Sequence, residues 1–152
     1  MIGPTGQITS LVERFFGCNR PPQVSLMSVA ASAEHPAILV LCSCPGETIA
    51  LELARTLVRE RLAACVNRVP GVTSVYLWEG RICEDSEQLL VIKTTPACYP
   101  ALEMRLKTLH PYEIPEIIVI PVVTGSRQYL AWLSTATDPD SAASTPLSVH
   151  PT

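Results

Sequence analysis

The chain has 152 residues, enough for one domain with a substantial hydrophobic core. Hydrophobic residues make up 47% of it, charged residues make up 16%, and the net charge is −3. Nucleic-acid binding normally needs a clustered basic face, and a membrane-spanning helix needs roughly 20 apolar residues in a row; the chain offers neither. The composition therefore predicts a soluble protein with no nucleic-acid partner and no membrane insertion. Sparse charge also suits a chain that buries surface against copies of itself.

The two ends of the chain differ from its centre. Residues 1–36 are rich in Pro, Gly, Ser and Ala, and we expect a flexible N-terminal extension there. A transit peptide is one interpretation; we favour the alternative that Met27 is the natural start of the protein. Residues 137–152 have the composition of a disordered tail.

The sequence contains six cysteines. The chain lacks a convincing secretory signal, and several of the cysteines lie in or beside apolar, strand-like runs. Disulfides are characteristic of oxidising compartments, so this pattern favours reduced thiols in a cytoplasmic protein.

Between the ends, strand-like and helix-like patterns alternate. Apolar runs predict strands, and apolar residues at three- and four-residue spacing predict amphipathic helices. Gly80 marks a hairpin turn, and Pro111 ends the second helix. The expected elements, in chain order, are a strand over Ala37–Cys44, a helix over Glu47–Leu62, a strand over Cys65–Glu79 with a bend at Pro70-Gly71, a strand over Ile82–Thr95, a helix from Pro96 to Leu109, a strand over Glu116–Val122 and a short helix over Gln128–Leu133.

The order β-α-β-β-α-β predicts an α+β domain over residues 37–136 with a ferredoxin-like fold. In that arrangement both helices cover one face of a four-stranded antiparallel sheet. The first and third strands are central. The long second and third strands form a hairpin.

Two features of this fold predict self-assembly. Each hairpin arm spans about 30 Å at roughly 3.3 Å per residue, whereas the helices cover only about 18–24 Å at 1.5 Å per residue. The first strand is also apolar on both faces, with Ile38, Val40, Cys42 and Cys44 on one face and Ala37, Leu39 and Leu41 on the other. The helices bury only one face, so a second copy of the chain is the simplest cover for the other.

An ordered series of short motifs then resembles the CutA proteins. The motifs are Leu41–Pro45, Glu60–Asn67, Val69–Gly71, Ser74–Gly80, Lys93–Thr95, His110–Tyr112, Ile114–Glu116 and Tyr129–Trp132. The resemblance runs without a break from about Ala37 to Ala136. It implies a ferredoxin-like homotrimer, usually cytoplasmic in bacteria, that is linked to tolerance of copper and other divalent cations. Eukaryotic members are associated with anchoring a membrane enzyme.

The same resemblance implies a copper or other divalent-metal site. Cys42 matches the family's metal-binding cysteine and His110 matches its histidine, with Glu116 as a plausible third ligand. Some members carry a second histidine where this chain has Leu109, and Cys44 could compensate. The topology supports this grouping, because the end of the first strand meets the start of the last, and residues two apart on a strand share a face. Thiolate and imidazole suit copper or zinc.

Structural roles compete with this interpretation. Buried cysteine often fills a core, and His110 could cap the second helix. Tyr76 and Trp78 share a face of the hairpin and favour an interface over a pocket. No nucleophile elbow, phosphate loop or nucleotide fingerprint occurs in the sequence, so we expect a non-enzyme. Two other hypotheses are a small-ligand sensor resembling the PII signalling proteins and a trimeric protein-binding scaffold without metal.

Overall fold

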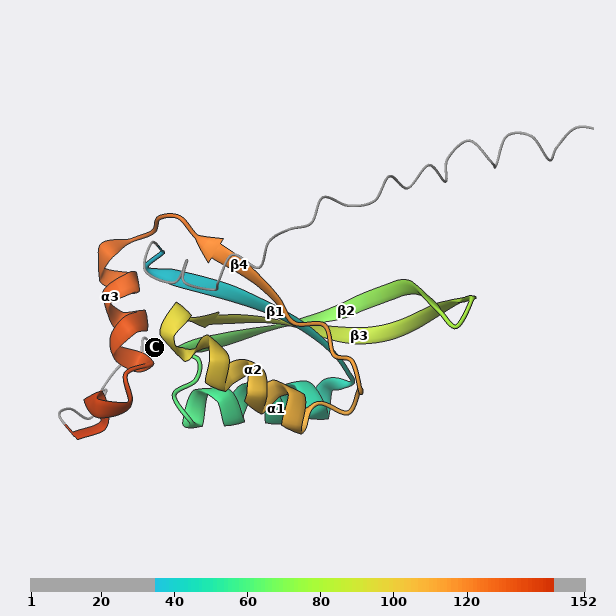
Figure 1. The fold of residues 1–152 in the computed structure, drawn as a ribbon, viewed down its shortest axis with the longest axis horizontal. Helices are drawn as coiled ribbons and strands as arrows, with labels where there is room; N and C mark the ends of the chain where they lie inside the picture. The colour runs from blue at the N-terminus through green and yellow to red at the C-terminus, as the bar shows by residue number, and fades with distance from the viewer. Residues whose placement is uncertain (1–34, 144–152) are drawn as a thin grey trace, which may run out of the picture. The chain divides into compact units, whose positions relative to one another are not determined.

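The computed structural model describes residues 35–143 as an α+β domain (Figure 1). Its elements are β1 (Ala37–Pro45), α1 (Glu47–Arg59), β2 (Cys65–Trp78), β3 (Arg81–Thr94), the short helix η2 (Pro96–Cys98), α2 (Tyr99–Leu109), β4 (Ile118–Val122), α3 (Arg127–Ala136) and the short helix η3 (Pro139–Ala143). The predicted order of strands and helices is confirmed. The expected N-terminal extension, the alternative start at Met27 and most of the expected tail lie outside the described residues.

The four strands form one antiparallel sheet in the order β2-β3-β1-β4. This order confirms the prediction that the first and third strands are central. Helices α1 and α2 run side by side across one face of the sheet (Figure 1). The chain therefore has a helix-covered face, an opposite outer face and two open edge strands, β2 and β4.

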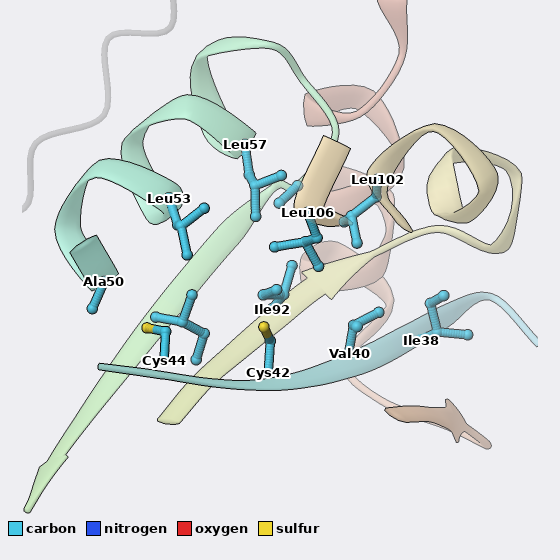
Figure 2. Close-up of a cluster of buried hydrophobic side chains, with 12 residues drawn as sticks. Ile38, Val40, Cys42, Cys44, Ala50, Leu53, Leu57, Ile92, Leu102 and Leu106 are labelled. Carbon is cyan, nitrogen blue, oxygen red and sulfur yellow. The ribbon is translucent and has the colours of Figure 1, made fainter. Parts of the chain in front are cut away.

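The core lies between the sheet and these two helices. Alternate residues of β1 point toward the helices, and Leu90 and Ile92 of β3 lie beside them. Helix α1 contributes Leu53 and Leu57, and α2 contributes further leucines. Figure 2 shows this layer, in which the buried side chains are Ile38, Val40, Cys42, Cys44, Ala50, Leu53, Leu57, Ile92, Leu102 and Leu106. The apolar spacing read from the sequence thus corresponds to one continuous core.

The outer face of the sheet is also apolar, and most of it has no cover within the described chain. The register places Ile120 opposite Leu39 and Ile118 opposite Leu41, so all four side chains share this face. Ile118 and Ile120 are 49% and 40% exposed. Helix α3 covers only one end, where Leu133 packs with Ala37 and Ala64. A layer of apolar side chains therefore faces outward beyond α3.

The hairpin of β2 and β3 extends beyond the ends of α1 and α2 (Figure 1). Each arm has 14 residues and spans about 46 Å at roughly 3.3 Å per residue, longer than the expected length. Strand β2 continues through the bend at Pro70-Gly71 as one strand. The register shifts between Val69 and Val72, and Gly71 has a φ of 75°, a left-handed conformation that glycine adopts without steric cost.

The end of α1 and the start of β4 differ from the sequence predictions. Helix α1 ends at Arg59 because Arg61 adopts a left-handed φ of 58°, and the N–H groups of Leu62 and Ala63 both bond to the carbonyl of Leu57. Leu62 still packs against the core. Strand β4 begins at Ile118, not at Glu116, because its ladder with β1 reaches only as far as Leu41.

The C-terminal side is more ordered than expected as far as Ala143. Helix α3 covers Arg127–Ala136 and is longer than predicted. The predicted disordered tail instead begins with η3. The side chain of Asp138 accepts a hydrogen bond from the N–H of Asp140 at 2.9 Å, and its carbonyl accepts one from Arg61 at 3.4 Å. These hydrogen bonds hold the start of the tail in place, and composition alone does not reveal them.

Candidate functional site

His110 lies at the exit of α2 and joins this helix to β1. Its backbone N–H bonds to the carbonyl of Leu106 at 2.8 Å, so it occupies the C-cap position of α2, but its ring bonds to β1 and not to the last carbonyls of the helix. Its ring is buried, with 7% of the residue exposed. Nδ1 accepts a hydrogen bond from the N–H of Tyr112 at 3.1 Å, and this assigns the proton to Nε2, which donates to the carbonyl of Ser43 at 2.9 Å. Both ring nitrogens are therefore engaged.

Cys42 and Cys44 lie on the core face of β1, on either side of the carbonyl that His110 contacts. Both residues are fully buried, and their sulfur atoms lie among apolar side chains (Figure 2). Burial raises the pKa of Cys42 to about 12, with the negative charges of Cys44, Glu116 and Glu87 adding to the effect. Burial, followed by the charge of Glu87, raises the pKa of Cys44 to about 11. At neutral pH both are uncharged thiols, and a thiolate is the form that binds metal.

Glu116 precedes β4, and its side chain is exposed. Its negative charge contributes to the raised pKa of Cys42, so Glu116 lies in the same region of the fold as that thiol. The predicted donors do not, however, form a coordination shell. Within residues 35–143 no three His, Cys, Asp or Glu side chains are grouped so that they could hold a metal ion. In this arrangement the predicted copper donors therefore do not fit a metal: two sulfur atoms lie within the apolar core, and both ring nitrogens of His110 are hydrogen-bonded to main-chain groups.

A buried carboxylate beside this region was missed by the sequence interpretation. Glu87 of β3 is only 5% exposed, and its Oε2 lies 2.5 Å from the hydroxyl of Ser74. Burial, followed by the nearby Glu87 carboxylate, raises the pKa of Tyr112 to about 12. No sequence signal marked Glu87, because it lies in an acidic stretch of the hairpin that is typical of a solvated strand.

The hairpin aromatics lie where the sequence placed them. Tyr76 and Trp78 are 43% and 52% exposed, and the Tyr76 hydroxyl donates to Asp85 at 2.5 Å. This bond to Asp85 is the main cause that raises the pKa of Tyr76 to about 12. Because both rings are exposed to solvent, a role in an interface with another molecule is favoured over a role in lining a pocket.

A four-stranded antiparallel sheet with two helices on one face and a projecting hairpin defines a small α+β protein. The family model described as CutA1 divalent ion tolerance protein matches residues 38–136. The chain belongs to the CutA divalent-cation tolerance family, which confirms the resemblance noted in its motifs.

Individual relatives support this assignment. The "Divalent-cation tolerance protein CutA" of Thermus thermophilus is 53% identical over 95 residues, which are 62% of this chain and 92% of that protein. The human "Protein CutA" is 43% identical over 120 residues, 78% of this chain and 67% of that protein. The solved structure of the Thermus thermophilus divalent cation tolerance protein aligns with a TM-score of 0.66 at 50% identity, over 67% of this chain and 99% of that chain.

The predicted cytoplasmic location is wrong, because the family is not confined to that compartment. An Arabidopsis thaliana relative, 42% identical over 74% of this chain and 62% of its own length, is named "Protein CutA, chloroplastic". A solved structure from Archaeoglobus fulgidus, 28% identical with a TM-score of 0.66 over 67% of this chain and 99% of its own, is described as periplasmic. Five cysteines of residues 35–143 are unpaired, but free thiols do not select one compartment. Within the same residues, no helix is both long enough and apolar enough to cross a membrane.

Proposed function

We propose that this chain is the subunit of a ferredoxin-like homotrimer that supports tolerance of divalent cations without catalysing a reaction. The observation that carries the proposal is the uncovered apolar layer on the outer face of the sheet, together with the hairpin that extends past the helices. An exposed apolar face favours association, because burying apolar surface contributes roughly 25 cal/mol per Å².

The outer face is suited to a partner of the same kind. Leu39 and Leu41 lie in the centre of the face, the isoleucines of β4 extend it to one edge, and Val69 of β2, 41% exposed, extends it toward the other. Charged side chains are few there, with Lys93 opposite Cys65 as an exception. The family resemblance supports closed three-fold symmetry for the assembly.

The link to divalent cations comes from the names of the relatives. Because the donors inside one chain do not fit a metal, we assign Cys42, Cys44 and His110 to the core and to the helix cap. Glu116 is the exposed member of the predicted set. The proposed contribution to cation tolerance therefore rests on the assembled protein and not on a copper site buried in each subunit.

Light scattering after gel filtration tests the assembly. We expect three times the chain mass for the wild type and a smaller species for Ile120→Glu, because this change places a charge within the apolar layer, beside Leu39. Ile114→Glu is the matched control: Ile114 is 72% exposed and lies outside the sheet, so its variant should remain assembled. A monodisperse wild-type monomer would refute the proposal.

A further inference from the structure

An open hollow lies on the helix side of the sheet, between α1 and the edge strand β2. Its floor is apolar and comes from both elements, with Leu51, Ala54 and Val58 on the helix and Val66 on the strand. Its rim is basic, because Arg55, Arg59 and Arg68 border the same hollow. Three of the eleven basic residues of the chain thus border one surface hollow, although the net charge is −3.

The guanidinium groups on this rim are poorly neutralised. Arg55 and Arg59 lie one turn apart on α1, and neither has a carboxylate within 4 Å in residues 35–143. Arg68 has one distant contact, 3.5 Å, to Glu47, whose side chain is 76% exposed. Arg105 shows the contrast, since its guanidinium makes three hydrogen bonds of 2.6–3.1 Å to Glu60. The rim therefore keeps positive charge that is free to meet an anion.

We propose that this hollow binds an organic phosphate: a phosphate monoester carried on a flat apolar ring. The planar guanidinium fork matches phosphate oxygens in pairs, which lysine cannot do. The apolar floor offers a surface for the ring, and arginine also stacks on aromatic faces. An anion without an apolar body would leave the floor unused, and a neutral ring would leave the guanidinium groups unused.

The hollow lies on a different face of the sheet from the proposed assembly surface. Val66 packs against the core beneath the helices, so the hollow lies on the opposite side of the sheet from the outer face. The inference thus goes beyond the proposed function.

Isothermal titration of the full chain with phenyl phosphate, at low ionic strength, tests the site. We expect saturable binding at least tenfold tighter than that of inorganic phosphate and no measurable binding of phenol. The Arg55→Gln/Arg59→Gln variant should weaken phenyl phosphate binding at least tenfold. The matched control is Arg81→Gln/Arg127→Gln, which removes two exposed guanidinium groups outside the hollow and should leave binding unchanged.

A second variant separates charge from geometry. Arg55→Lys/Arg59→Lys keeps both charges but loses the paired contacts, so it should bind more weakly than the wild type and more tightly than the glutamine pair. Equal losses in the glutamine pair and its control would overturn the site, as would inorganic phosphate binding as tightly as phenyl phosphate. A hexaglutamate peptide that binds more tightly than phenyl phosphate would assign the hollow to an acidic polypeptide and would also overturn the proposal.

Discussion

At the scale of single residues, the chemistry around β1 is determined by two backbone groups that carry no side-chain signature. The carbonyl of Ser43 and the N–H of Tyr112 occupy the two nitrogens of His110. The topology of the sequence grouped His110 with Cys42 and Cys44, and the ring of His110 bonds to the carbonyl between these two cysteines. The sequence could not predict that both nitrogens of the imidazole would already be bonded, because such bonds depend on the path of the main chain and not on the spacing of residue types.

This arrangement predicts the outcome of a metal titration. We expect wild-type protein and the Cys42→Val/His110→Gln variant to bind zinc with the same affinity, because the thiol is neutral and the imidazole has no free lone pair. Isothermal titration at pH 7 with both proteins is the measurement. The exposed carboxylate variant Glu116→Gln serves as the comparison. If the double variant bound zinc at least tenfold more weakly than the wild type, Cys42 and His110 would be metal ligands after all.

The raised pKa of Cys42 predicts how stability depends on pH. Its value is about 12 in the folded chain against 9.0 for the free side chain, so the folded state holds this proton more tightly. The resulting stabilisation is complete below about pH 9 and is lost as the pH rises toward 12, with a slope of about 1.4 kcal/mol per pH unit per thiol.

Urea unfolding under reducing conditions from pH 7.5 to 10.5 measures this slope. The Cys42→Val variant keeps a similar volume, so we expect a change of less than about 1.5 kcal/mol at pH 7.5. Above pH 9, the free energy of unfolding of the variant should fall less steeply with pH than that of the wild type, because the variant lacks the proton that Cys42 releases on unfolding. Tyrosines that titrate in the same range are present in both proteins and cancel. Identical slopes would show that Cys42 does not keep its proton on folding.

At the scale of elements, the sequence was most informative where one residue type decides the geometry. Three features appear where the pattern placed them: a first strand with apolar side chains on both faces, the turn at Gly80 and the bend at Pro70-Gly71. The boundaries that could not be predicted depend on tertiary partners. Leu62 continues the helical spacing, but the chain leaves the helix at Arg61, and β4 starts only where β1 offers backbone partners.

The hairpin turn offers a prediction of its own. Glu79 and Gly80 both have left-handed φ values, 48° and 75°, and Trp78 pairs with Arg81 across a two-residue turn. This is the type I′ geometry, in which Asn-Gly is strongly preferred and a glutamate is strained. We expect Glu79→Asn to stabilise the fold by about 0.5–1 kcal/mol in thermal or urea unfolding.

Glu84→Asn is the control for this change. It removes the same charge from the same hairpin but from a paired strand position, and it should not stabilise the protein. A stabilisation of equal size in both variants would show that loss of negative charge, and not the backbone conformation at Glu79, is responsible.

At the scale of the whole molecule, the two faces of the sheet have different roles. The helix face holds the core within one chain, whereas the outer face carries apolar side chains that the described residues leave largely uncovered. The hollow between α1 and β2 belongs to the helix side. Self-association and ligand binding can therefore be changed separately by substitution.

The uncovered outer face has a thermodynamic consequence. If three chains bury it together, part of the stability of each fold comes from association, and association follows mass action. The melting temperature of the wild type should then rise with protein concentration, and calorimetry over a hundredfold dilution series measures this rise. Ile120→Glu should melt at a lower and concentration-independent temperature, and a wild type with a constant melting temperature would contradict the coupling. A cell would thus hold a more stable fold wherever the protein is abundant and a weaker one wherever it is dilute.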